Sequence, residues 1–180
     1  MVHEINKLST PAIPSIQLYD SGAQNFTTAG EFHTWDTIAF KTTDFHYTAD
    51  DDRVIIQLPS TGYYEVIFEC SFKNTSMWQL VTSTSQLYLN GEVVSGAKAV
   101  GCSGFDTAEY PQLVSCACIT LHFILYLNAN DYIQIKTTTA TIGDMDSVAN
   151  TSRLIVKFIP TRGWNNSSGG NINYKGEVMR

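Results

Sequence analysis

Charged residues are scarce in this sequence, and no part of it is strongly basic. Asp, Glu, Lys and Arg make up 16% of the 180 residues, and the formal net charge is -6. The eleven Lys and Arg residues are scattered along the chain. A protein that packages or reads nucleic acid draws most of its affinity from clustered positive charge. We therefore expect no nucleic-acid partner.

Long hydrophobic runs are missing as well. None approaches the roughly 18 to 20 consecutive apolar residues of a membrane-spanning helix, so no membrane partner is expected. The segment MVHEINKLSTPAIPSIQ has no basic start followed by an apolar stretch, which is the pattern of a secretory signal. We expect the chain to fold in a cytoplasm.

The four cysteines show no paired Cys-x-x-Cys or Cys/His spacing of the kind that holds structural zinc. Without a secretion route the expected state is the free thiol, and a free buried cysteine packs as a small apolar residue. Two disulfides remain an alternative that the sequence leaves open. The cysteines are Cys70, Cys102, Cys116 and Cys118.

Recognisable catalytic motifs are absent too. There is no Gly-x-Ser-x-Gly elbow, no phosphate-binding glycine loop and no His-Glu-x-x-His, and the four histidines are far apart in the sequence. We expect no enzyme activity, no catalytic residues, no metal and no cofactor. Asp50, Asp51 and Asp52 could hold calcium, but they lack an alternating ligand pattern, and a solvated acidic loop is favoured.

Strand patterns dominate what is present. In PSTGYYEVIFECSF, Pro59 to Phe72, a turn leads into a segment whose apolar residues recur at every second position, as in a half-buried strand. Asn90-Gly91 lies between two further strand-like runs and predicts a tight hairpin. In Leu113 to Leu127 the odd-numbered positions are almost wholly apolar, so that face should fill a core. The alternating positions of the first strand are Tyr64, Val66, Phe68, Cys70 and Phe72.

Eight or more such strands with Gly, Asn, Asp and Ser turns between them predict an all-β antiparallel sandwich or barrel. We expect an irregular N-terminal arm over residues 1–14, one domain over 15–160, and a Gly/Asn/Ser-rich tail over 161–180. Four apolar residues in this tail favour docking onto a partner, and a flexible tail that docks onto nothing is the open alternative. They are Trp164, Ile172, Tyr174 and Val178, the predicted capsid-anchoring residues.

The order and spacing of several segments resemble a known superfamily. They are LYDSGAQNF, TWDTIAF, DFHYTADDDRVIIQLPSTGYYEVIFECSF, LYLNGEVV, ILYLNANDYIQIK and SRLIVKFIP. In this order they resemble the jelly-roll superfamily of the complement C-one-q globular head and tumour necrosis factor (TNF), and most closely its phage and bacterial structural variants. Gly62-x-Tyr64 opening a strand is one of the best-marked matches. The resemblance implies a TNF-like jelly-roll β-sandwich whose first and last strands are neighbours, assembled around a threefold axis.

The function that this resemblance favours is that of a non-enzymatic virion structural protein. We expect a trimeric phage head decoration or short fibre protein on the capsid exterior, made in the host cytoplasm and bound to the major capsid protein or another virion protein. An alternative is a receptor- or glycan-binding module of a tail fibre, with Trp78, Phe105 and Tyr110 stacking on a host-surface glycan. A secreted complement- or TNF-like ligand is a third.

The homotrimer itself has a basis in the sequence. The second face of Leu113 to Leu127 also carries more apolar surface than a soluble monomer leaves in water, so another subunit should cover it. The predicted interface residues are Tyr64, Val114, Cys116, Cys118, His122, Ile124 and Tyr126.

Overall fold

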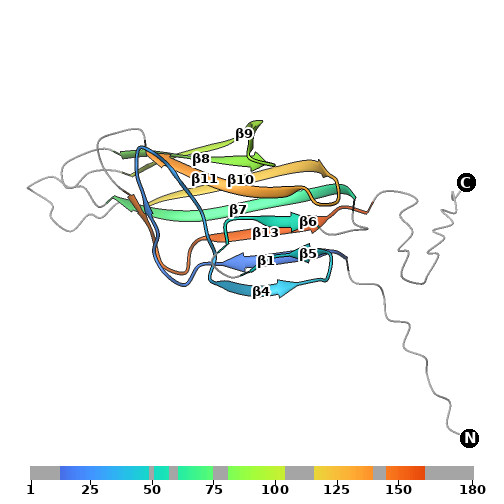
Figure 1. Cartoon of the computed structure of the whole chain (residues 1–180). Helices are drawn as coiled ribbons and strands as arrows, with labels where there is room; N and C mark the ends of the chain where they lie inside the picture. Colours follow the sequence, from blue (N-terminus) through green and yellow to red (C-terminus); the bar gives the residue numbers. More distant parts are fainter. Residues whose placement is uncertain are drawn as a thin grey trace, which may run out of the picture.

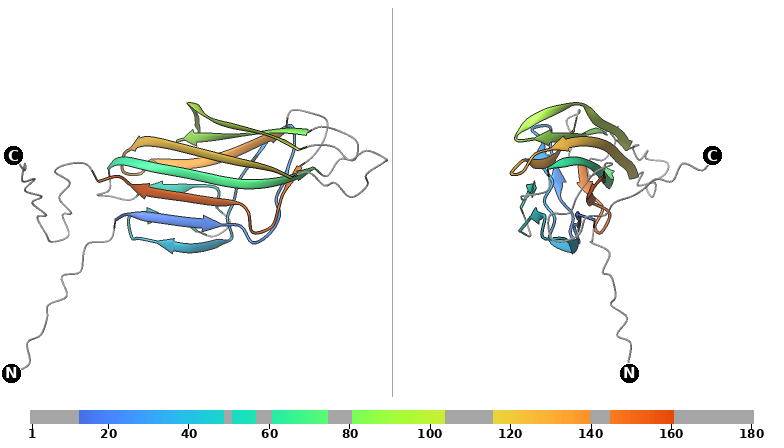
Figure 2. Two further views of the ribbon diagram at one scale, coloured as in Figure 1. Left: turned by 180° about the vertical axis from the view of Figure 1, so that it is seen from behind. Right: turned by 90° about the vertical axis from the view of Figure 1, so that its right-hand side faces the viewer.

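The computed structural model describes residues 13–48, 51–56, 61–74, 81–103, 116–139 and 145–160. Every regular element in them is a β-strand, and the strands form two antiparallel sheets that pack face to face (Figures 1 and 2). The expected all-β jelly-roll sandwich is therefore confirmed. The described part of the chain contains no helix that is long and apolar enough to cross a membrane.

The first sheet, which we call sheet A, has the strand order β4-β1-β13-β7-β10. A short β12 continues the pairing along the far part of β7, and β2 pairs with β12. The strands are β1 (Ser15–Tyr19), β2 (Asn25–Phe26), β4 (Thr37–Lys41), β7 (Gly62–Asn74), β10 (Cys116–Leu127), β12 (Met145–Ser147) and β13 (Arg153–Phe158).

The second sheet, sheet B, has the order β5-β6-β11-β8-β9, with β3 also paired to β11. The strands are β3 (Glu31–Phe32), β5 (Phe45–His46), β6 (Val54–Ile56), β8 (Val81–Leu89), β9 (Glu92–Ser103) and β11 (Tyr132–Thr139).

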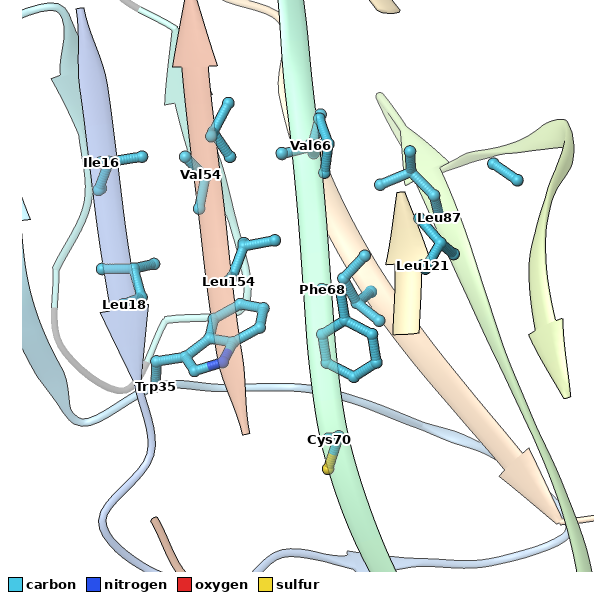
Figure 3. Packing of buried hydrophobic residues seen from close by; sticks show 14 of the residues in the cluster. Ile16, Leu18, Trp35, Val54, Val66, Phe68, Cys70, Leu87, Leu121 and Leu154 are labelled. Atoms are coloured by element: carbon cyan, nitrogen blue, oxygen red, sulfur yellow. The ribbon is translucent and has the colours of Figure 1, made fainter. Parts of the chain in front are cut away.

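The core lies between the sheets, and alternation along the strands places its residues there. All five alternating positions of β7 are buried, from Tyr64 to Phe72. On β10 the odd-numbered residues Ile119, Leu121 and Leu127 are buried. Figure 3 shows Val66, Phe68 and Leu121 together with side chains from both sheets. Phe123 and Leu125 are partly buried and pack against this core. The predicted inward face is therefore confirmed for β7 and, from Ile119 to Leu127, for β10; Leu113 lies outside the described residues.

The glycines of two sequence motifs, Asn90-Gly91 and Gly62-x-Tyr64, occupy positions where a side chain would be strained or would clash. Asn90 and Gly91 both have positive φ, 53° and 82°, as a two-residue hairpin between β8 and β9 requires. A Cβ on Gly62 would lie 2.5 Å from the ring of Phe158, so the start of β7 needs glycine for β13 to pack closely.

The first and last strands are neighbours, as the resemblance implies. β1 pairs with β13 from Ser15 opposite Lys157 to Tyr19 opposite Arg153, and the backbone N–H of Phe158 donates to the carbonyl of Pro14 at 2.8 Å. β13 therefore ends where β1 begins (Figure 1). We call this end of the sandwich the exit pole. Apart from Ile13 and Pro14, the predicted arm and the tail lie outside the described residues.

A candidate subunit interface on sheet A

The face of sheet A that points away from the core carries an exposed patch on β7 and β10. Residues of the two strands face each other in register, with Tyr126 opposite Tyr63, Ile124 opposite Glu65, and His122 opposite Ile67. Because opposite residues on antiparallel strands point to the same side, these side chains share one surface. We call them the outer-face patch: Tyr63, Glu65, Ile67, His122, Ile124 and Tyr126.

The apolar part of the patch is concentrated toward the exit pole. The rings of Tyr63 and Tyr126 meet edge to face, with centroids 5.2 Å apart. Tyr63 is 48% exposed and Tyr126 is 53% exposed, although both rings already contact each other. Ile124, beside Tyr126 on the same face, is also exposed. The patch therefore offers aromatic and aliphatic surface that the single chain leaves uncovered.

The charges of this face are paired within it. His122 Nε2 lies 2.8 Å from Glu65 Oε1. On the adjacent strand the Arg153 guanidinium binds Glu69, with Nε donating to Oε2 at 3.1 Å. Lys157 lies opposite Glu65 in the β13–β7 register. Each carboxylate of β7 thus has a cation or an imidazole beside it, so two copies of this face would meet without strong repulsion.

The predicted interface residues fall into three groups. Cys118, His122, Ile124 and Tyr126 lie exposed on the outer face of sheet A, where the prediction needs them; their contact with another subunit stays a prediction. Val114 lies outside the described residues, and only the strand placement of Cys116 is described.

The assignment of Tyr64 to the interface is wrong. Its side chain is 0% exposed and packs edge to face against Phe45 and Phe158, with centroids 5.9 and 5.3 Å away. It lies in the core because it is in phase with Val66 and Phe68. Its neighbour Tyr63 lies on the outer face instead. An aromatic residue on the otherwise more polar face of this strand was the signal that could have identified Tyr63 as an interface residue.

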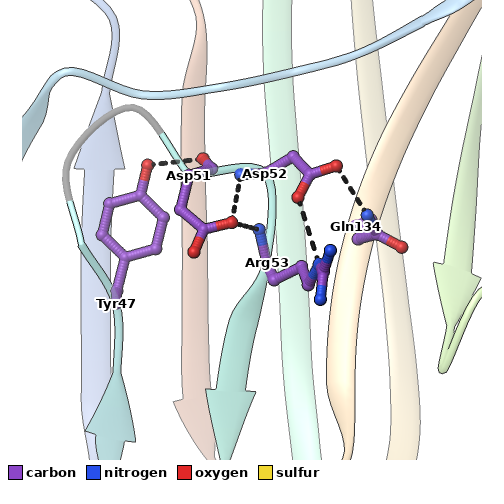
Figure 4. Close-up of polar contacts among 5 residues, drawn as sticks. All are labelled: Tyr47, Asp51, Asp52, Arg53 and Gln134. Carbon is purple, nitrogen blue, oxygen red and sulfur yellow. Dashed lines mark hydrogen bonds and ion pairs between the residues drawn. The ribbon is translucent and has the colours of Figure 1, made fainter.

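The acidic loop forms internal contacts (Figure 4). Asp51 Oδ1 accepts from the backbone N–H groups of Asp52 and Arg53 at 2.8 and 3.1 Å. Asp52 Oδ2 accepts from Gln134 Nε2 at 2.8 Å, and its other oxygen lies 3.5 Å from Arg53 Nε. Asp50 lies outside the described residues. The two described carboxylates therefore cap the start of β6 and tie it to β11.

Sequence reasoning missed a buried polar group in the core. His33 is fully buried; its Nε2 lies 2.8 Å from Thr137 Oγ1, and its Nδ1 lies 3.4 Å from Ser152 Oγ. Burial lowers the pKa of His33 to about 3, so the ring is neutral at physiological pH. The rings of Phe26 and Phe68 pack against it. A histidine beside a hydroxyl group can activate that hydroxyl as a nucleophile. Here His33, Thr137 and Ser152 are all buried, so a substrate cannot reach them.

The cysteines differ in exposure. Cys70 is buried, and burial raises the pKa of its thiol to about 12, which keeps it protonated and unreactive. Cys118 is a free, exposed cysteine whose Sγ lies 3.1 Å from Ser71 Oγ. Side chains of Cys102 and Cys116 are not among those described. The predicted anchoring residues Trp164, Ile172, Tyr174 and Val178 also lie outside the described residues.

Comparison with known proteins identifies the fold of the chain. No protein-family model matches the chain, and no curated protein sequence matches it. Among solved structures, murine APRIL at pH 5.0 is similar with a TM-score of 0.55 and 10% identity, covering 82% of this chain and 100% of that one. Eiger TNF from S. frugiperda is similar with a TM-score of 0.55 and 11% identity, covering 88% of this chain and 99% of that one. The chain thus has the TNF-like jelly-roll fold.

Proposed function

We propose that this chain is a non-enzymatic structural protein that assembles as a homotrimer through the outer face of sheet A and is displayed on the exterior of a virion. The trimer is supported by the outer-face patch, and the virion role by the resemblance of the sequence to phage structural variants of the superfamily. Head decoration or a short fibre is the form that we favour.

The main support for the homotrimer is the distribution of exposed apolar side chains. Eight large hydrophobic residues are exposed in the described part of the chain. Five belong to sheet A, two belong to sheet B, and one precedes β1. Of the five on sheet A, Tyr63, Ile124 and Tyr126 are contiguous in the outer-face patch. Soluble monomers rarely leave a contiguous apolar patch uncovered, and a second copy would bury it. In order, these residues are Ile13, Ile38, Phe40, Tyr63, Val93, Val100, Ile124 and Tyr126.

The geometry of the chain ends supports attachment through one pole. The first and last described residues lie together at the exit pole, so the segments beyond Ile13 and Pro160 both begin there. A displayed protein needs one end to bind its support and the other to face outward. We propose that the exit pole faces the major capsid protein or another virion protein.

The virion role is tested by co-sedimentation. Purified protein is mixed with capsids from its own source and, in parallel, with host-envelope vesicles. We expect saturable binding to capsids in multiples of three copies. Binding to envelopes without binding to capsids would contradict the decoration role and favour the receptor-binding alternative.

A further inference from the structure

Strand β4 is an edge strand with exposed apolar side chains on both of its faces. Within the described residues it pairs only with β1, and Figure 1 shows it at the margin of sheet A. The register of β1 with β4 shifts between Gln17 and Leu18, so Ile38 lies opposite the buried Leu18 whereas Phe40 lies opposite Gln17, on the other face. Ile38 is 38% exposed and Phe40 is 51% exposed. Free edges of this kind invite another strand, and native proteins usually cover or charge them.

The exit pole lies beside this edge. The backbone N–H of Thr42, just beyond the end of β4, donates to the carbonyl of Ser15 at 2.9 Å, and the N–H of Ser15 donates to Thr42 Oγ1 at 3.1 Å. β1 is antiparallel to both β13 and β4, so β4 and β13 run in the same direction, toward the exit pole. A chain segment that turned back after β13 would therefore run antiparallel to β4.

The sequence after Pro160 contains a segment that suits this position. In NINYKGEV, residues 171–178, apolar Ile172, Tyr174 and Val178 share one phase, and Asn173, Lys175 and Glu177 occupy the other. This two-residue period is typical of a strand with one buried face. Before it comes TRGWNNSSGG, residues 161–170, a composition that suits a connection and not a core.

The distances permit the connection. Beyond β4, the new strand would lie three strand spacings from β13, or about 14 Å. A Gly/Ser-rich stretch of about eleven residues has a root-mean-square span of roughly 17 to 20 Å. Such a tether also holds its segment at an effective concentration in the millimolar range, which favours the edge of the same chain over that of another copy.

We propose that residues 171–178 add to sheet A as an antiparallel strand on the free edge of β4 in the same chain, with Ile172 and Tyr174 on the side of Ile38. The tail then covers the exposed edge, and the remainder of the tail and the N-terminal arm are left at the exit pole for other contacts. This inference rests on the edge of sheet A and not on the proposed virion role.

Hydrogen exchange on the full chain tests the strand. We expect the amides of 172–178 to exchange at least tenfold more slowly than those of 165–170, and the amides of β4 to lose protection at least tenfold when residues 161–180 are deleted. Ile172→Ser should reproduce the deletion, and Asn173→Ser, on the opposite face, should not. Equal exchange of β4 in the full chain and the deletion variant would overturn the proposal.

A cross-linking measurement tests whether the strand belongs to the same chain. Protein refolded from a mixture of isotopically heavy and light chains is treated with a lysine-reactive reagent. Lys175 should join Lys41, at the exit-pole end of β4, within one chain. If the Lys41–Lys175 link joined heavy to light chains, the edge would be covered by another copy and the assignment to the same chain would be overturned.

Discussion

His33 shows how the core combines apolar packing with a polar group that is shielded from solvent. Its ring lies among aromatic side chains, and its bond to Thr137 continues to Ser85, whose Oγ is 2.7 Å from Thr137 Oγ1. Protonating this ring inside the sandwich would bury a charge, for which no acidic side chain forms a described partner. His33 therefore links the stability of the fold to pH.

The direction of this linkage follows from the pKa. Burial depresses the pKa of His33 from 6.5 to about 3, so between these values the unfolded chain binds the proton and the folded chain does not. The contribution is fully present above pH 6.5 and is lost as the pH falls toward 3. From pH 7 to pH 4 we expect His33 to account for roughly 3 kcal/mol of lost unfolding free energy.

Urea unfolding at the two pH values measures this effect. His33→Gln stays neutral and can still bond to Thr137, so its stability should fall by roughly 3 kcal/mol less than that of the wild type over this interval. The matched control is His46→Gln, which replaces an exposed histidine on β5; the same altered pH dependence in that variant would show that the effect does not depend on burial. Identical pH dependence in wild type and His33→Gln would contradict the assignment.

Single residues also mark the limit of sequence reasoning. Alternation placed Phe68 and Leu121 in the core correctly, because a half-buried strand has a fixed two-residue period. The same pattern contradicted the interface assignment of Tyr64, which rested on a family motif and not on its phase. The contacts of His33 could not be predicted, because Thr137 and Ser152 are more than 100 residues away in the sequence.

Among the elements of the fold, long strands and tight turns could be predicted from the sequence, whereas very short strands could not. β7 and β10 show alternation over many residues, and Asn90-Gly91 carries its own conformational signal. β2, β3 and β5 have two residues each, too few for any period, and they exist because long-range neighbours supply their hydrogen-bond partners. The outer-face patch likewise depends on the register of β7 with β10, which only the fold provides.

The β8–β9 hairpin gives a prediction at this scale. Gly91 has φ of 82°, a conformation that costs a residue with a Cβ roughly 1 to 2 kcal/mol, and a Cβ there would lie 3.3 Å from the hydroxyl of Tyr132. Gly91→Ala should therefore lower the unfolding free energy by about that amount in urea. Gly22→Ala, in an exposed turn with only an ordinary contact at 3.6 Å, should change it little. A fully stable Gly91→Ala variant would exclude the strained turn.

At the scale of the whole molecule, the two sheets differ in what they present to solvent. Sheet B exposes Val93 and Val100 on the single strand β9, whereas sheet A exposes apolar residues on β4, β7 and β10. The chain has a net charge of -6, so copies repel one another in general. On the outer face of sheet A, however, Arg153 pairs with Glu69, and Lys157 lies opposite Glu65 in the register, which removes much of that repulsion where association is proposed.

Two exposed residues of similar size test which sheet associates. Ile124 on sheet A is 57% exposed, and Val100 on sheet B is 59% exposed. Ile124→Arg can pair with the adjacent Glu65 in the single chain, so the subunit should fold, but a charge buried at each subunit contact should prevent assembly. Val100→Arg should leave assembly intact. In light scattering the wild type and Val100→Arg should give three times 20.0 kDa, about 60 kDa, and Ile124→Arg about 20 kDa. A wild-type particle of 20 kDa at high concentration would reject the trimer, and loss of assembly in Val100→Arg alone would place the interface on sheet B.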